Sequence, residues 1–342
     1  MSDPGLTTGL TLGQHLMEAL RRTGAPDEDL TRILGGVAVA AKTLSREIRG
    51  AALAGNLGLA GDRNVTGDAQ KKLDLVGNTT VLDALGATGV IAAVVSEELP
   101  EAEPLAGTAG RYVVCTDPLD GSSNTDINGT VGTIFGVYRR RQTGPVDPVA
   151  DLLRTGTEQV LAGYVLYGPS TLLVYTAGRG SHGFTLDVDR DEFVLTHPAI
   201  RCPARGPYVS ANLTRYPDWD PGVQRFVAAL TAPPRPGESG KPRTWSLRYT
   251  GALVADVHRG LVEGGIYLYP ADAKNRSGKL RLLYEAAPLA FVVEQAGGAA
   301  STGTRPIRDV RAETIHQRVP LVIGSADDVA LYERFVREGS AS

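Results

Sequence analysis

The chain has 342 residues, 42% of them hydrophobic, and a formal net charge of -3. This length exceeds one typical domain and predicts one large or two fused α/β domains with a sizeable core. The small negative charge gives no electrostatic reason to expect nucleic acid or an anionic membrane as a partner. No apolar run approaches the ~20 residues that span a bilayer. Residues 1–5 lack the start of a secretory signal, so we predict a cytoplasmic protein.

The first third of the chain is predicted to form helices, interrupted by a glycine-rich segment. Apolar residues at helical spacing predict a short helix over 13–22 and a long one over 30–48. Glycines recur in the segment that follows, and ordering so many glycines is costly in entropy, so residues 50–72 are predicted to form a mobile lid. Helical periodicity then returns over 70–85.

Two apolar runs, 90–95 and 112–114, predict buried strands that each lead into acidic residues. Glu97 and Glu98 follow the first run, and Asp117 follows the second, with Asp120 beside it in a predicted turn. The carboxyl ends of strands are where open α/β sheets bind ligands. Like charges gathered there repel one another unless a cation neutralises them. The pattern therefore predicts a divalent-cation site with hard oxygen ligands.

The residues after Asp120 favour an anion. Gly121, Ser122 and Ser123 offer backbone N–H groups and two hydroxyls at a strand-to-helix junction, which is the chemistry that cradles a phosphate. By themselves these residues also fit an ordinary polar turn. Similarly, Asp74 at a helix start is most simply a partner of the helix dipole.

The middle of the chain predicts an antiparallel meander, because short β-branched runs alternate with glycine and aspartate turns. The predicted strands are 131–138, 160–167, 171–175, 181–187 and 192–195. A second region begins at 208, with further predicted elements at 252–263 (helix), 265–270 (strand), 280–295 (helix), 319–323 (strand) and 327–337 (helix).

The helix predicted over 280–295 is informative because of one acid. Between 282 and 293 every residue except Glu285 is apolar, aromatic or proline, and Pro288 is expected to kink the helix. A helix that is apolar all round is buried, and an unpaired buried carboxylate is costly. Glu285 therefore needs a cation, which can be arginine, lysine or a metal ion.

Several motifs carry a resemblance to a known family. They are N-V-T-G-D (64–68), K-K-L-D (71–74), V-S-E-E (95–98), D-P-L-D-G-S-S-N (117–124), G-T-I-F-G (132–136), A-D-V-H-R (255–259), G-G-I-Y-L-Y-P (264–270) and G-K-L-R-L-L-Y-E (278–285). With these motifs the chain resembles the class I fructose-1,6-bisphosphatases over essentially its whole length. The resemblance implies a layered α-β-α-β-α sugar phosphatase sandwich with two fused halves, assembled as a homotetramer. Residues 1–205 would form a regulatory and metal-binding half, and residues 206–342 a sugar-phosphate-binding half.

The resemblance also implies a reaction and its cofactor. The reaction is the Mg²⁺-dependent hydrolysis of the 1-phosphate of fructose 1,6-bisphosphate to fructose 6-phosphate, in gluconeogenesis or Calvin-type carbon metabolism, with Mn²⁺ able to substitute. By matching positions, the metal ligands would be Glu97, Asp117, Asp120, Glu285 and the carbonyl of Leu119. The proton of the attacking water would pass to Asp74, with Asp68 or Glu98 nearby.

The substrate contacts implied by the resemblance form two groups. The reacting phosphate would lie on Asp120, Gly121, Ser122 and Ser123. The second phosphate and the sugar would contact Asn212, Tyr216, Tyr249, Tyr269, Lys279 and Arg281, together with Arg248 from a neighbouring subunit. Tyr216 lies one residue further from Asn212 than in the animal enzymes.

An inhibitory AMP site is the point at which this sequence departs from the animal pattern. Thr31, Arg111, Tyr112 and Arg139 match AMP-binding positions, but the segment 27–29 is acidic. Added carboxylates would repel a phosphate, so we expect AMP not to inhibit.

Other functions remain open from the sequence. A sedoheptulose-1,7-bisphosphatase, or an enzyme that accepts both substrates, would use the same charged contacts. A non-catalytic sugar-phosphate sensor is a candidate of a different class, although every acid that the metal ions need is present. An inositol monophosphatase is disfavoured because those chains are shorter and lack the pocket of Lys279 and Arg281.

Overall fold

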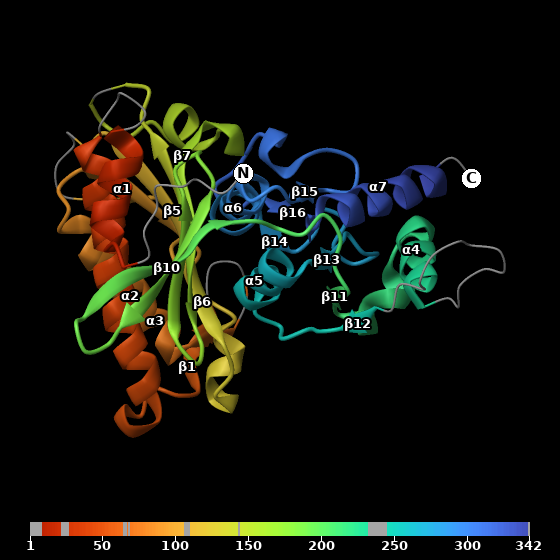
Figure 1. Ribbon diagram of the computed structural model, residues 1–342, viewed down its shortest axis with the longest axis horizontal. Coiled ribbons are helices and arrows are strands. Elements are labelled where there is room, and N and C mark those ends of the chain that lie inside the picture. Colours follow the sequence, from red (N-terminus) through yellow and green to blue (C-terminus); the bar gives the residue numbers. More distant parts are fainter. Residues whose placement is uncertain are drawn as a thin grey trace.

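The computed structural model describes residues 9–21, 27–63, 67, 69–105, 110–142, 144–231 and 245–340. Five layers, alternately of helices and of sheet, follow one another along the long axis of the molecule (Figure 1). The described residues form three hydrophobic cores between these layers. One lies on the outer face of each sheet, under the helices that cover it, and the third lies between the two sheets. The layered α-β-α-β-α architecture predicted from the resemblance is thus confirmed.

The larger sheet has eight strands in the order β10-β9-β8-β7-β6-β5-β3-β4. Its strands are β3 (Ile91–Ser96), β4 (Glu103–Pro104), β5 (Tyr112–Asp120), β6 (Val131–Arg139), β7 (Gln159–Tyr167), β8 (Thr171–Thr176), β9 (Ser181–Asp187) and β10 (Glu192–Ile200). All neighbours are antiparallel except β3 and β5, which are parallel. The predicted meander is confirmed, and its last strand runs five residues further than expected, to Ile200.

Three helices cover the outer face of this sheet: α1 (Leu12–Arg21), α2 (Glu28–Ala54) and α3 (Lys72–Gly86). Asp27 is the N-cap of α2, where its side chain accepts the Asp29 N–H. A small hairpin of β1 (Leu59–Arg63) and β2 (Ala69–Lys71), here called the lid hairpin, connects α2 to α3. The first five residues of the predicted lid are helical, because α2 continues to Ala54 before Gly55 ends it with a φ of 72°.

The central layer lies between the two sheets, and its apolar side chains belong to the core that both sheets share. It consists of α5 (Leu253–Glu263), the π-helix η5 (Leu282–Ala286) and α6 (Ala287–Gln295). The single helix predicted over 280–295 is therefore wrong in part, since a two-residue strand β14 (Leu280–Arg281) and η5 precede α6. Pro288 lies in the first turn of α6, directly after η5, at a position where proline is favoured in helices; the expected kink stays a prediction.

The smaller sheet has five strands in the order β12-β11-β13-β17-β15, with two helices on its outer face. These elements are β11 (Tyr208–Ala211), β12 (Ser246–Leu247), β13 (Gly265–Tyr269), β15 (Ala299–Ser301), β17 (Leu321–Gly324), α4 (Pro221–Thr231) and α7 (Ala326–Ser340). The remaining short elements are η1 (Ser122–Ile127), η2 (Pro148–Leu152), η3 (Gly156–Glu158), η4 (Leu213–Asp218), η6 (Ile307–Asp309) and β16 (Arg318–Val319).

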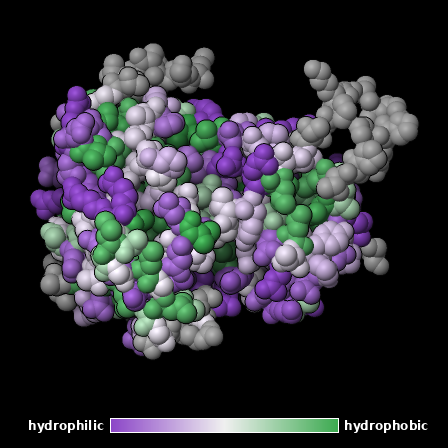
Figure 2. Space-filling view, turned by 90° about the horizontal axis from the view of Figure 1, so that it is seen from below, coloured by the Kyte–Doolittle hydropathy of each residue, from purple (hydrophilic) through white to green (hydrophobic). Residues whose placement is uncertain are grey.

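The surface mixes polar and apolar side chains. From below, hydrophobic residues form separate patches among hydrophilic ones (Figure 2). The structure assigns no described helix the length and apolar character that a membrane span requires. The predicted division at residue 205, the mobility of the lid and the cytoplasmic location stay predictions.

Candidate active site

The site lies at the carboxyl ends of the two parallel strands, as the sequence predicted. β3 and β5 pair through Ser96 and Thr116, and the Glu97 N–H donates to the Thr116 carbonyl at 3.2 Å. Both strands are fully buried along their lengths. Because the strands run in the same direction, the acids that follow them meet at one edge of the sheet.

A β-bulge in β5 brings two acids of this strand together. The sequence predicted a turn here, but the strand continues to Asp120, and its pairing with β6 shifts between Asp117 and Asp120. The Thr133 hydroxyl donates to the Pro118 carbonyl at 2.8 Å, and the Leu119 N–H donates to Asp117 at 3.0 Å. In a regular strand residues three apart point to opposite faces, and one extra residue removes that alternation.

Three carboxylates from different elements gather at this edge. One oxygen from each of Glu97, Asp117 and Glu285 lies within 4.8 Å of the others, in a search of the described residues. Arg281 lies beside them, with its guanidinium 2.7 Å from Glu97 and 3.8 Å from Glu285. The sequence predicted a cationic partner for Glu285, and Arg281 is such a partner. We call Glu97, Asp117, Asp120 and Glu285 the metal-site acids.

Burial and mutual repulsion perturb these acids. Burial is the largest cause that raises the pKa of Asp117, Asp120 and Glu285, and the charge of Glu97 raises each of them further. Backbone N–H groups and Arg281 oppose the rise only in part. A divalent cation among these oxygens would favour their ionised forms, and oxygen-only donors suit a hard cation. The residues therefore fit a metal ion of the magnesium type.

The turn Gly121–Ser123, here called the phosphate turn, follows the bulge directly. Gly121 has a φ of 75°, a left-handed conformation that favours glycine. An added Cβ would lie 2.5 Å from the Cβ of Ala252, so the turn packs tightly against the residue before α5. The Asp120 carboxylate accepts the N–H groups of Leu253 and Val254 at 3.3 and 2.8 Å.

Two further acids lie beside the metal-site acids. Asp74 is 5% exposed, and its carboxylate accepts the Lys71 N–H at 2.7 Å within a capping box. Burial is the main cause that raises its pKa. Burial and the charge of Asp74 raise the pKa of Glu98 to about 7, while the Gln70 amide donates to Glu98 at 2.5 Å. Asp68, the other predicted catalytic acid, lies outside the described residues.

The lid hairpin is fastened to η1 by a residue that the sequence analysis missed. Asp126 accepts the Gly58 N–H at 2.9 Å and the Lys71 ammonium at 2.5 Å. A single aspartate in a polar run carries no sequence signal for such a contact. It ties both ends of the hairpin to the segment that follows the phosphate turn.

Most of the predicted site residues line one cleft of about 330 Å³. Its lining contains Ala69, Asp74, Glu97, Glu98, Asp117, Leu119, Asp120, Gly121, Ser122, Ser123, Lys279, Arg281 and Glu285. Five predicted substrate residues are not in that lining: Asn212, Tyr216, Arg248, Tyr249 and Tyr269.

Those five residues lie on the smaller sheet and its loops. Burial and the nearby charges of Tyr269, Asp256 and Asp120 raise the pKa of Tyr249 to about 12, so this phenol lies near the site. In contrast, the Tyr216 hydroxyl donates to the Gln224 carbonyl of α4 at 3.3 Å.

The other three of the five lie as follows. Asn212 caps η4, since its side chain accepts the Thr214 N–H at 3.2 Å. The Arg248 guanidinium lies over the Tyr208 ring, 5.7 Å from its centre. The Tyr269 ring stacks beside Tyr267, with ring centres 6.3 Å apart.

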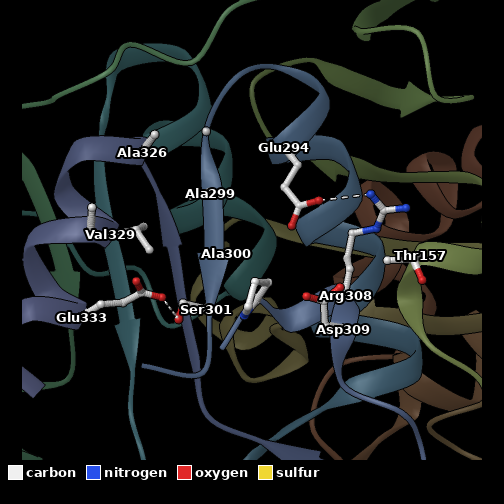
Figure 3. Close-up of a pocket in the computed structure, with 13 residues that line it drawn as sticks. Thr157, Glu294, Ala299, Ala300, Ser301, Arg308, Asp309, Ala326, Val329 and Glu333 are labelled. Carbon is white, nitrogen blue, oxygen red and sulfur yellow. Dashed lines mark hydrogen bonds and ion pairs between the residues drawn. The ribbon is translucent and has the colours of Figure 1, made fainter. Parts of the chain in front are cut away.

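A second cavity, of about 430 Å³, lies between η6, β15 and the start of α7 (Figure 3). Arg308 and Glu294 face each other across one wall at 3.1 Å, and the Ser301 hydroxyl donates to Glu333 at 2.5 Å on the other. None of the predicted site residues appears among the residues that line it.

Two of the four predicted effector residues form ion pairs with the chain's own acids. Arg111 and Arg139 pair with Asp29 and Asp27 respectively, and the Tyr112 hydroxyl donates to Asp27. Asp27 and Asp29 thus hold the start of α2 against the amino end of β5. Thr31 lies in the first turns of the same helix.

The fold and the site together define a class. Buried acids that fit a divalent cation, set beside an amide-lined turn on a layered α/β sandwich, are the equipment of a metal-dependent phosphatase of small phosphate esters. Comparison with known proteins narrows this class. The family "Fructose-1-6-bisphosphatase, N-terminal domain" matches residues 10–198, and "Fructose-1-6-bisphosphatase, C-terminal domain" matches residues 202–337.

Individual relatives are similar to this chain over nearly its whole length. A "Fructose-1,6-bisphosphatase class 1 2" of Acaryochloris marina is 51% identical over 333 residues, covering 97% of this chain and 98% of that protein. A "Fructose-1,6-bisphosphatase class 1" of Chlorobium chlorochromatii is 45% identical, covering 95% and 97%. The holo crystal structure of Leishmania major fructose-1,6-bisphosphatase is similar with a TM-score of 0.89 and 38% identity, covering 97% and 100%. The chain belongs to the class 1 fructose-1,6-bisphosphatase family, and it is a metal-dependent enzyme that hydrolyses fructose 1,6-bisphosphate.

Proposed function

We propose that this chain uses Mg²⁺ to release the 1-phosphate of fructose 1,6-bisphosphate, and that Mn²⁺ can replace it. The observation that carries the proposal is the approach of Glu97, Asp117 and Glu285 oxygens to within 4.8 Å of one another, next to the phosphate turn. With Asp120 and the carbonyl of Leu119, these groups would hold the metal ions. When bound, the ions neutralise the phosphoryl charge and lower the pKa of water.

The chain's own groups would orient the ester and accept a proton. The phosphate turn would hold the 1-phosphate through its N–H groups and the hydroxyls of Ser122 and Ser123. Asp74, supported by Glu98, would accept the proton of the attacking water, because both line the same cleft and burial raises the pKa of each. Asp68 is proposed to assist when the lid closes.

The second phosphate would bind on the side of the smaller sheet. Tyr249 and Tyr269, together with Asn212, would contact it, and Lys279 and Arg281 would supply positive charge. Arg248 is proposed to reach the site of a neighbouring subunit in a homotetramer. Tyr216 has the least structural support among the proposed contacts, since its hydroxyl already donates a hydrogen bond to α4.

A phosphate-release assay tests the proposal and its alternatives. We expect release from fructose 1,6-bisphosphate with Mg²⁺, loss of activity after chelation, and recovery when Mg²⁺ or Mn²⁺ is added back. Equal kcat/KM on sedoheptulose 1,7-bisphosphate would indicate an enzyme that accepts both substrates. Binding of the sugar phosphate with no release under any metal would instead support a sensor and contradict the proposal.

A further inference from the structure

Helix α5 begins between the two proposed phosphate subsites. The Asp120 carboxylate accepts its first N–H groups, from Leu253 and Val254, and the phosphate turn packs on Ala252 at its N-cap. A metal-site acid and the seat of the reacting phosphate are therefore fixed to the same helix start. Any movement of this helix start would move both.

The residues just before α5, Tyr249–Gly251, connect the two subsites and are here called the 249–251 turn. On one side, the Asn124 amide of η1 donates to the Thr250 carbonyl at 3.2 Å. On the other side, this turn carries Tyr249, which is proposed to contact the second phosphate. Gly251 adopts a φ of 81° in the left-handed region, and an added Cβ would meet nothing within 4 Å.

Asp256 holds this turn from within α5. Its carboxylate, in a residue that is 3% exposed, accepts the Thr250 N–H at 3.0 and 3.1 Å and the Gly251 N–H at 3.3 Å. Within the described part of the chain, no lysine, arginine or histidine nitrogen lies within 4.0 Å of the Asp256 carboxylate. A buried carboxylate without a cation depends on such N–H donors, so the bonds to the turn compensate the burial of the Asp256 carboxylate.

We infer that Asp256 is a positioning residue that sets the spacing between the two phosphate subsites by holding the 249–251 turn against the start of α5. This inference rests on the proposed roles of the phosphate turn and Tyr249. Asp256 itself does not line the catalytic cleft. It acts through the turn, so its effect depends on whether a substrate carries the second phosphate.

The test compares two substrates in the Asp256→Asn variant. Asparagine keeps the shape of the side chain but turns an NH₂ group toward N–H donors, so one acceptor is lost. For fructose 1,6-bisphosphate we expect KM to rise about tenfold with kcat changed less than about threefold. For fructose 1-phosphate, which lacks the second phosphate, kcat/KM should stay within about twofold of wild type. Glu263→Gln, at the exposed end of the same helix, is the matched control and should change neither.

A second variant keeps the inference testable if Asp256→Asn does not fold. Gly251→Ala strains the same turn through its left-handed φ without a steric clash, so it should reproduce the selective loss on the bisphosphate. Equal losses on both substrates in the folded variants, or no loss on either, would overturn the positioning role. A wild-type protein that releases no phosphate would instead contradict the proposed function.

Discussion

At the scale of single residues, Asp74 combines two constraints. Its carboxylate closes the capping box of α3 by accepting the Lys71 N–H, and it also lines the candidate active-site cleft with Glu98. Asp74 is also 5% exposed, so its carboxylate is largely removed from water. Burial raises the pKa of Asp74, so its carboxylate is a stronger base than that of an exposed aspartate, which suits a group that accepts a proton during the reaction.

The variant Asp74→Asn separates these two constraints. The amide oxygen can still accept the Lys71 N–H, so the helix start is retained, but the side chain can no longer take a proton. We expect kcat to fall about 10²–10⁴-fold, with substrate affinity by equilibrium binding changed little. Asp83→Asn, on the exposed side of the same helix, is the control and should retain full activity. Wild-type turnover in Asp74→Asn would reject its role as the proton acceptor.

At the scale of elements, the start of α2 depends on charge. Burial raises the pKa of Asp27, but the Tyr112 hydroxyl and the charges of Arg139 and Arg111 outweigh it, so the pKa of Asp27 lies below its usual value. A group with a lowered folded-state pKa stabilises the fold above its unfolded-state pKa. That stabilisation is lost as the pH falls through the lowered value.

Asp27→Asn should therefore destabilise the protein only where Asp27 is ionised. Asparagine remains a good N-cap, so the loss comes from the ion pair with Arg139 and amounts to roughly 0.5–1 kcal/mol. We expect Tm to fall by about 1–2 °C at about pH 7, and the difference from wild type to shrink below about pH 4 and to vanish only below the lowered pKa of Asp27. Glu101→Gln, an exposed acid in a loop, is the control. A difference that persisted unchanged at acid pH would contradict the charge explanation.

The elements also show what the sequence could predict and what it could not. Strands such as β3 and β6, with continuous apolar runs, were located closely because burial on both faces leaves a direct pattern. The bulge at Asp117–Asp120 was not predicted, because it depends on the pairing with β6 and on the bond from the Thr133 hydroxyl of that strand. The contacts of Asp126 and Asp256 were not predicted for the same reason: each accepts backbone N–H groups that are distant in sequence or lie in a loop.

The gathering of the metal-site acids in one cleft was predictable for a different reason. Charged residues at the ends of buried strands, or within an apolar helix, violate the hydrophobic pattern, and such violations need a cation or a partner. The position of Arg281 between Glu97 and Glu285 fits this logic. The contacts of Tyr216 do not follow from its neighbours in sequence, because they depend on the packing of α4 against η4.

At the scale of the whole molecule, one strand connects the predicted effector residues to the active site. β5 begins at Tyr112, beside the start of α2, and ends at Asp120 among the metal-site acids, a span of roughly 25–30 Å. An anion bound near Arg111 and Arg139 would therefore be well placed to influence this strand. In this chain, however, Asp29 and Asp27 already pair with these two arginines.

We therefore expect AMP not to inhibit this enzyme. Its phosphate would have to displace two carboxylates that belong to the fold, and it would meet their repulsion on approach. Phosphate release should be unchanged at about 1 mM AMP, a concentration that would fill a site of micromolar affinity. The double variant Asp27→Asn with Asp29→Asn removes both carboxylate charges and should bind AMP more tightly than wild type, as measured by calorimetry. Half-inhibition of the wild-type enzyme below about 1 mM AMP would mean that the effector can displace the two aspartates.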